Sequence, residues 1–442
     1  MVYAPLRGQF ITLVDKKVVE ILKNLKRYQK SKDKGILNVI EFFKKQGIID
    51  GPKDKPPKIK IPKKIEPTWM TLFPTSDCNF RCKYCYSRAG ETQHYMNWEL
   101  TKASIDFLFN SLKKQKKKST SIDFHGGGEP FLDKSWSIVV KAIRYIKKKS
   151  KEQKIKTRIG GVSNGSFSKE KRNFIIENFD SIQISIDGPK DIQNDQRPMI
   201  INEKPVSSFD IVMKNIRALE KAKFRFNVRA TLSKEGLKRF REIIEFFKKN
   251  MNIKNLTFEP LSCWGRQKST LIVPPNKKEF AKTFVNEMFY QLKDGFRLNY
   301  SNFDFKRTTP CWCGSFFVVT PDGYVTNCIE VSNKKDPRAN LFFYGYYNRG
   351  KKKFIFDIKK FQNKLNRNIN NLDYCKNCFA KYQCAGECMA KIKTMDPYDI
   401  KNSNRCSIVK TMMEEFLVKL LNQENKDLIC ELGGKSVDIP KM

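Results

Sequence analysis

The middle of the chain alternates between short apolar runs and longer segments that carry one apolar face. The apolar runs, which predict strands, are residues 68–73, 120–124, 156–162, 181–186, 224–232 and 255–261. The amphipathic segments, which predict helices, are residues 97–114, 134–149, 168–178, 207–221, 234–249 and 276–292. Strands that alternate with helices of this length are typical of parallel α/β sheets. Six such units over residues 68–293 predict an open, partial (β/α)6 TIM-like barrel rather than a closed barrel of eight strands.

The first 50 residues predict a small separate unit. A strand-like stretch at 9–14 precedes a helix at 16–29 and a second helix at 35–46. This order has the outline of a reduced winged helix, which would offer an edge strand to an extended peptide. The alternative is a cap that packs on the next domain. Residues 51–67 are rich in Pro and Lys and predict an extended linker.

Composition narrows the class of protein. With 442 residues and 40% hydrophobic content, the chain is long enough for two or three domains with a large core. No apolar run reaches the ~20 residues of a membrane span, and the N-terminus lacks a signal-peptide pattern, so we expect a cytoplasmic protein. Thirteen cysteines beside two histidines then favour sulfur-ligated metal over disulfides.

The net charge of +40 would attract anions such as nucleic acid or an acidic peptide. The lysine runs at 113–118 and 147–156 sit at helix ends and loops, and they lack the interleaved aromatic residues of a single-strand nucleic-acid platform. We therefore interpret most of the excess as solvated surface and do not expect nucleic-acid binding.

Three closely spaced cysteines follow the first predicted barrel strand. Cys78, Cys82 and Cys85 form a C-x3-C-x2-C array. Three thiolates do not complete a tetrahedral zinc site, and the nearest histidine, His94, lies well outside the loop. They can bind three irons of a [4Fe–4S] cluster and leave the fourth iron open. A disulfide or a zinc loop is the alternative.

With Tyr84 before its third cysteine, the array resembles that of the radical S-adenosylmethionine (SAM) superfamily. The resemblance implies that the open iron binds SAM, whose reductive cleavage yields a 5′-deoxyadenosyl radical that abstracts a hydrogen atom from substrate. The segment FHGGGEP at 124–130 resembles the motif of that family that binds the methionine amino group. By the same resemblance, SAM would contact these residues: Tyr84, Gly127, Gly128, Glu129, Ser163, Asn164, Ser185 and Asp187, with Arg197 or Arg229 on the carboxylate.

Eight further cysteines lie between residues 305 and 410, and their spacing resembles the SPASM extension of radical SAM enzymes. The family's ligation would give two auxiliary [4Fe–4S] clusters, three clusters in all. The first would use Cys311, Cys313, Cys328 and Cys388, and the second Cys375, Cys378, Cys384 and Cys406. The short Cys311–Cys313 spacing leaves an open iron possible in the first, and two zinc sites are the alternative. A hairpin at 320–328 would present Cys328.

Residues 411–442 predict a terminal helix and a tail with a non-ligand Cys430.

Known SPASM-type enzymes modify peptide or protein side chains, so the resemblance implies a maturase acting on a ribosomally made peptide. The product would be a thioether or carbon–carbon link or a related radical modification. A sulfatase maturase is one alternative, although Ile329 and Glu330 follow Cys328 where such enzymes have an Asp. The others are a small-molecule radical SAM oxidoreductase and a non-catalytic metal scaffold. Expected partners are a leader-guided precursor peptide and an electron donor such as ferredoxin or flavodoxin.

We interpret Cys263 as a half-buried packing thiol rather than a substrate contact.

Overall fold

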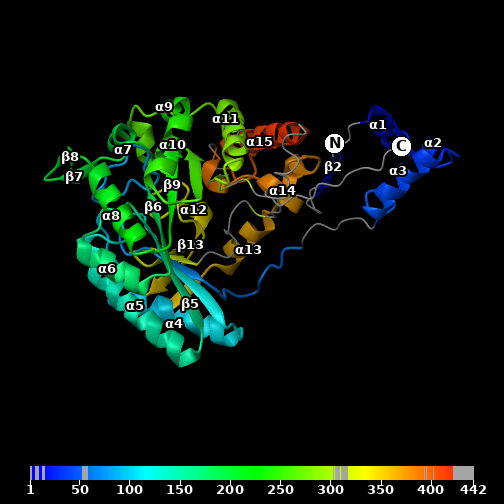
Figure 1. Ribbon diagram of the computed structural model, residues 1–442. Coiled ribbons are helices and arrows are strands. Elements are labelled where there is room, and N and C mark those ends of the chain that lie inside the picture. Colours follow the sequence, from blue (N-terminus) through cyan, green and yellow to red (C-terminus); the bar gives the residue numbers. More distant parts are fainter. Residues whose placement is uncertain are drawn as a thin grey trace.

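The fold is that of an α/β protein with a separate N-terminal unit (Figure 1). The computed structural model describes residues 2–4, 9–11, 15–51, 58–301, 303, 309, 317–392, 394, 396–401 and 403–421. The predicted ligands Cys311 and Cys313, and also Cys430, lie outside these residues. None of the described helices is long and apolar enough to cross a membrane.

The six predicted barrel strands form and pair in parallel. They are β3 (Met70–Leu72), β4 (Ser119–Phe124), β5 (Lys156–Ser163), β6 (Ser181–Ser185), β9 (Phe226–Leu232) and β10 (Asn255–Pro260). They follow one another in that order, and β11 (Arg297–Asn299) adds a further parallel strand beside β10. The sheet stays open, because β3 and β10 lie five positions apart with no direct pairing.

Helices cover the outer face of this sheet (Figure 1). They are α4 (Trp98–Lys114), α5 (Asp133–Gln153), α6 (Lys169–Asn178), α8 (Phe209–Lys221), α9 (Lys234–Lys238), α10 (Phe240–Asn250) and α11 (Lys277–Leu292). Helix α10 shows the predicted spacing, since Phe240, Ile243, Ile244 and Phe247 are all buried. The predicted helix at 234–249 is divided at Arg239. The short helix α7 (Lys190–Gln196) and the hairpin β7 (Met199–Ile201) and β8 (Lys204–Val206) were not predicted.

The C-terminal region continues the same sheet. Strand β12 (Val318–Val319) pairs in parallel with β3, and β13 (Tyr324–Thr326), β14 (Phe343–Asn348) and β15 (Lys353–Phe356) follow as antiparallel strands. Within the described residues the sheet has eleven strands. The predicted hairpin at 320–328 is therefore present as β12–β13, while its pairing with β3 was not anticipated.

Short helices complete this region. They are α12 (Ala339–Phe342), α13 (Ile358–Asn366) and α14 (Lys381–Cys384), with 3-10 turns at η3 (Ile369–Asn371), η4 (Asp373–Cys375) and η5 (Met389–Lys391), and they are followed by the long helix α15 (Asn404–Leu421). A further 3-10 turn, η1 (Gly265–Ser269), follows β10 in the barrel. Helix α15 matches the predicted terminal helix and packs against α11, where the Phe289 and Phe416 rings lie 5.5 Å apart.

The N-terminal unit has its own core. It consists of a hairpin, β1 (Val2–Ala4) and β2 (Gln9–Ile11), followed by α1 (Lys16–Lys23), α2 (Leu25–Tyr28) and α3 (Lys34–Lys45). Asp15 and Asp33 cap α1 and α3 by accepting backbone N–H bonds. Buried side chains of this unit pack on one another as a cluster distinct from the barrel core. The predicted single strand is one half of a hairpin, and the predicted first helix is interrupted at Asn24.

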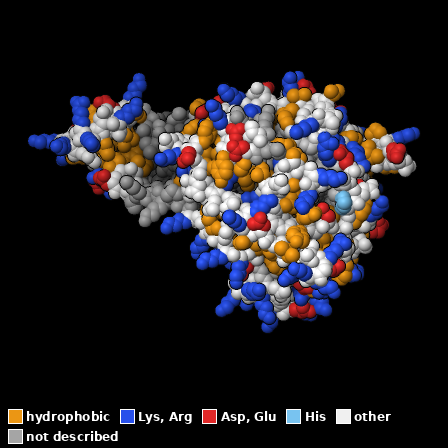
Figure 2. Space-filling view, turned by 180° about the vertical axis from the view of Figure 1, so that it is seen from behind, with side chains coloured by type: hydrophobic (Ala, Val, Ile, Leu, Met, Phe, Trp, Pro, Cys, Tyr) orange, Lys and Arg blue, Asp and Glu red, His pale blue; other side chains and the backbone are white. Residues whose placement is uncertain are grey.

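Lysine and arginine side chains are spread over the whole visible face and are mixed with acidic ones (Figure 2).

Candidate active site

The cysteine loop lies at the carboxyl ends of the parallel strands, as the sequence predicts. Cys78, Cys82 and Cys85 line one hollow of about 140 Å³. Segments that follow other strands reach the same hollow, and they contribute Gly127, Gly128, Glu129, Ser163, Asn164, Ser185 and Arg197. Gly128 is required here because a Cβ would lie 2.0 Å from the Asp77 carbonyl oxygen.

The cysteine thiols suit an iron–sulfur cluster. Burial, reinforced by the neighbouring Cys82 and Glu129, raises the pKa of Cys78, and burial raises the pKa of Cys82 to about 11. Such thiols ionise readily only when a bound cation compensates their charge. In the described part of the chain no three His, Cys, Asp or Glu side chains converge closely enough to share one metal ion. A [4Fe–4S] cluster has no such requirement, because each thiolate binds its own iron.

Glu129 is held at one side of the hollow by three hydrogen bonds. Its Oε1 accepts from the Ser163 hydroxyl at 2.8 Å and from the Phe131 backbone N–H at 3.1 Å, while Oε2 accepts from the Asn164 N–H at 2.7 Å. Burial raises the pKa of Glu129, and these donors oppose the rise. Ser163 and Asn164, predicted as SAM contacts, therefore also orient Glu129.

Tyr84 links two charged residues behind the cysteines. Its hydroxyl donates to Asp187 Oδ2 at 2.5 Å and accepts from Arg197 Nη1 at 2.6 Å. Asp187 also accepts from the Thr231 N–H at 2.9 Å, and it does not line the hollow. The Arg197 Nε is buried without a hydrogen-bond partner among the described residues. An unpaired guanidinium nitrogen in this hollow suits an anionic group such as the SAM carboxylate.

A second hollow of about 150 Å³ continues from the first, and Tyr84, Tyr86, His125, Ser185 and Arg197 line both. Arg229 lines only this second hollow, where its Nη2 lies 3.3 Å from Glu259 Oε1. Of the two arginines that the sequence offered for the SAM carboxylate, Arg197 is thus the one that lies beside the cysteines.

Three residues of the second hollow were not selected from the sequence. His125 stands directly before the glycine run, its Nδ1 accepts from the Gly126 N–H at 2.8 Å, and burial lowers its pKa to about 4. Its imidazole is therefore neutral near pH 7. Glu330 lies at the far side and is paired with Lys391 at 2.6 Å. Although burial opposes ionisation, the cations Lys391 and Arg405 hold the pKa of Glu330 below its ordinary value.

Two pairs of the described C-terminal cysteines are each buried in a common apolar cluster. Cys328 and Cys388 share one apolar cluster, and Cys375 and Cys406 share another. Burial raises the pKa of Cys375 to about 11, with Cys378 and Cys406 adding to the rise. Burial likewise raises the pKa of Cys384 to about 12, and Cys406 is among the groups that add to it. Cys263 is half-buried and lines neither hollow, in agreement with a packing role.

Residues 72–247 match the family model described as the Radical SAM superfamily. These residues form a radical SAM domain. Such a domain binds SAM and one [4Fe–4S] cluster, and within the described residues the hollow lined by the three cysteines offers donors that suit them.

Sequence relatives extend beyond the radical SAM domain. The chain is 24% identical over 369 residues to a "Cysteine-type anaerobic sulfatase-maturating enzyme" of Clostridium novyi (strain NT), an alignment that covers 78% of this chain and 94% of the relative. A protein of the same description from Clostridium perfringens (strain 13 / Type A) is 22% identical over 372 residues, covering 79% of this chain and 96% of the relative.

A solved structure shares the fold. The protein described as "Native anSMEcpe with bound AdoMet and Cp18Cys peptide" superposes with a TM-score of 0.63 at 19% identity, over 81% of this chain and 99% of that chain. At 81% of this chain, the likeness extends beyond residues 72–247, which form the radical SAM domain.

Proposed function

We propose that this chain is a radical SAM maturase that modifies a side chain or backbone position of a ribosomally synthesised peptide. The observation that carries the proposal is the pair of connected hollows. The cysteines lie in the first, and the second ends at Glu330 and Lys391 of the C-terminal region. The second hollow thus joins the radical-generating side to residues of the C-terminal region, where a side chain of a peptide could enter.

When bound, SAM and the cluster supply a 5′-deoxyadenosyl radical that removes a hydrogen atom from the substrate. The chain's own residues arrange this chemistry. Arg197 would pair with the SAM carboxylate, and Glu129, held by Ser163 and Asn164, would bind its amino group. The Tyr84 hydroxyl accepts a hydrogen bond from Arg197, and Tyr86 and His125 line both hollows.

The remaining cysteines would hold two auxiliary [4Fe–4S] clusters. Their grouping supports ligation by Cys328 and Cys388 in one, together with Cys311 and Cys313, and by Cys375, Cys378, Cys384 and Cys406 in the other. These clusters would accept the electron that the substrate radical gives up as the product forms, or bind substrate, while a donor such as ferredoxin or flavodoxin would reduce the radical-generating cluster. A reducing cytoplasm would keep the cysteine thiols available as ligands for these clusters.

The N-terminal unit supports a leader-guided peptide substrate. It carries its own core and a two-stranded hairpin to which an extended leader peptide could add as a third strand. The solved structure with the Cp18Cys peptide shows that a protein of this fold can bind a peptide.

The test is anaerobic turnover of the reconstituted protein with a small peptide encoded beside its gene. We expect 5′-deoxyadenosine and a change in the peptide mass, and both should disappear in Cys82→Ala. Removal of residues 1–64 should abolish modification of the leader-bearing peptide while SAM binding persists. An unmodified peptide with the intact protein would contradict the proposal.

One observation favours a second candidate, a sulfatase-maturating activity. The ionised carboxylate of Glu330 lies in the substrate hollow, where it could accept a proton, and the relatives found are sulfatase maturases. This activity would convert a cysteine or serine of a sulfatase peptide into formylglycine, whose aldehyde reacts with hydrazide probes. A hydrazide-reactive product from such a peptide, with no product from the neighbouring-gene peptide, would select this candidate.

A further inference from the structure

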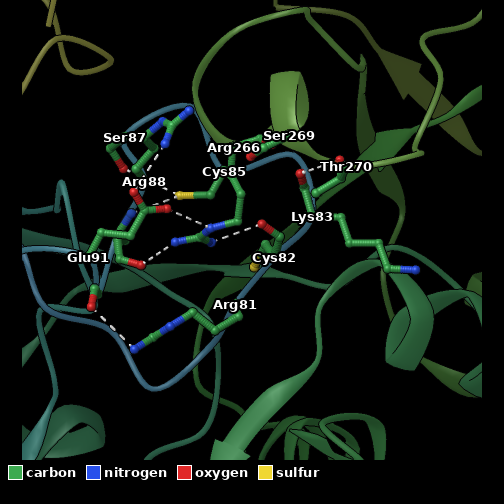
Figure 3. A network of polar contacts seen from close by, with 12 residues as sticks. Arg81, Cys82, Lys83, Cys85, Ser87, Arg88, Glu91, Arg266, Ser269 and Thr270 are labelled. Atoms are coloured by element: carbon green, nitrogen blue, oxygen red, sulfur yellow. Dashed lines mark hydrogen bonds and ion pairs between the residues drawn. The ribbon is translucent and has the colours of Figure 1, made fainter.

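The turn that follows the last barrel strand contacts the cysteine loop that follows the first. Strand β10 ends at Pro260, and η1 then places Gly265 against the backbone of Cys85 and Tyr86. Arg266 lies against the same loop, beside Cys82 and Glu91 (Figure 3). In the sheet β3 and β10 are separated by four strands, so no ladder hydrogen bonds join them. This contact therefore bridges the open side of the barrel at the end where the cysteines lie.

All three guanidinium nitrogens and the backbone N–H of Arg266 donate to this loop. Its Nη1 donates to the Cys82 carbonyl at 3.0 Å, its Nη2 to the Ala89 carbonyl at 2.7 Å, and its backbone N–H to the Cys85 carbonyl at 2.9 Å. The Nε pairs with Glu91 at 3.0 Å, which fixes the plane of the guanidinium (Figure 3). Only 9% of the residue is exposed.

Residues next to Arg266 in the sequence make further contacts with the cysteine loop. The Thr270 hydroxyl donates to the Lys83 carbonyl at 3.1 Å. Gly265 adopts φ +67°, and a Cβ there would lie 2.2 Å from the Cys85 carbonyl oxygen. Carbonyls from Cys82 to Ala89 are thus held by one turn, and two of the three cluster cysteines lie inside that stretch.

We propose that Arg266 is a positioning residue for the radical-generating cluster: it fixes the backbone that carries Cys82 and Cys85 and places a permanent positive charge beside them. Residues that orient metal ligands typically change metal affinity or activity about 10- to 100-fold when they are lost. A nearby cation also raises a cluster's reduction potential, because the reduced cluster carries one more negative charge. The proposal depends on the radical SAM domain and is independent of which peptide is modified.

The test uses the full, anaerobically reconstituted protein and needs no peptide. SAM changes the electron paramagnetic resonance spectrum of the cluster that it binds, so a SAM titration reports the radical cluster even beside auxiliary clusters. For Arg266→Gln we expect SAM to bind roughly 10- to 100-fold more weakly, with a lower reduction potential for that cluster. Arg266→Lys keeps the positive charge but loses the separate donors on Nε, Nη1 and Nη2. It should therefore retain the reduction potential of the cluster and still bind SAM more weakly.

Two control variants distinguish a positioning role of Arg266 from a general effect on folding. Glu91→Gln alters only the residue that orients the guanidinium, so it should shift SAM affinity in the same direction even if Arg266→Gln does not fold. Arg241→Gln breaks an arginine–glutamate pair, with Glu287 at 2.7 Å, on helices outside the site and should leave both readings unchanged. Wild-type SAM affinity, spectrum and potential in Arg266→Gln and Glu91→Gln would overturn the proposal, as would a loss of thermal stability alone.

Discussion

The buried pair of Glu330 and Lys391 offers a quantitative test of the C-terminal wall of the substrate hollow. The two side chains are 18% and 9% exposed and lie 2.6 Å apart, and Lys391 also donates to the Ser262 hydroxyl at 3.1 Å. Removing one partner of a buried ion pair typically costs about 3–5 kcal/mol, because the other charge remains uncompensated. In Glu330→Gln the stranded ammonium would also face Arg338, whose guanidinium lies 4.0 Å from Glu330.

At roughly 2 °C per kcal/mol for a unit of more than 200 residues, this cost lowers the melting temperature by about 6–10 °C. Glu330→Gln and Lys391→Met should each show that loss in differential scanning calorimetry of the reconstituted protein at a fixed scan rate. The double variant should melt above either single one, because it leaves no unpaired charge.

Exposed Glu235, which pairs with Lys238, gives the control, and Glu235→Gln should melt like the wild type. The reasoning is refuted if Glu330→Gln keeps the wild-type melting temperature, or if the losses of the two single variants simply add in the double variant.

Two further predictions concern single residues, and a third concerns the metal content. The pKa of His125 is lowered to about 4 in the folded protein from 6.5, so stability should fall as pH drops below 6.5; by pH 5.5 denaturant titration should show the wild type losing roughly 1 kcal/mol that His125→Gln keeps. Gly265→Ala should abolish the SAM-induced spectral change, whereas Gly295→Ala, at a similar φ of +72° but with open space around it, should not. Metal analysis should find about twelve irons per chain for three [4Fe–4S] clusters; two or three zincs in their place would contradict the cluster assignment.

The barrel could be predicted because each strand is a local apolar run and each helix has a local amphipathic face. Cys78, Glu129 and Ser185 could be placed together for the same reason, since parallel strands end at one edge of the sheet. The pairing of β12 with β3 could not, because it joins residues about 250 positions apart and leaves no local pattern. Cys311 and Cys313 lie outside the described residues, so their ligation stays a prediction.

The residues that sequence reasoning missed act through contacts rather than motifs. Arg266 is one of many basic residues in the chain, and only its position against three carbonyls distinguishes it. The role of Lys391 likewise depends on its ion pair with Glu330, which lies 61 positions away in the sequence. His125 could be predicted as a site residue from the sequence, because it directly precedes the glycines of the FHGGGEP segment.

The shared sheet has a consequence for how this protein can be divided. Because β12 hydrogen-bonds along β3, a fragment cut after α11 would bare the edge of the strand that leads into the cysteine loop. Bare strand edges recruit other chains, so such a fragment should aggregate rather than behave as an independent catalytic half. Evolution could therefore exchange the N-terminal unit by altering a linker, while the barrel and its cysteine-rich continuation must be inherited together.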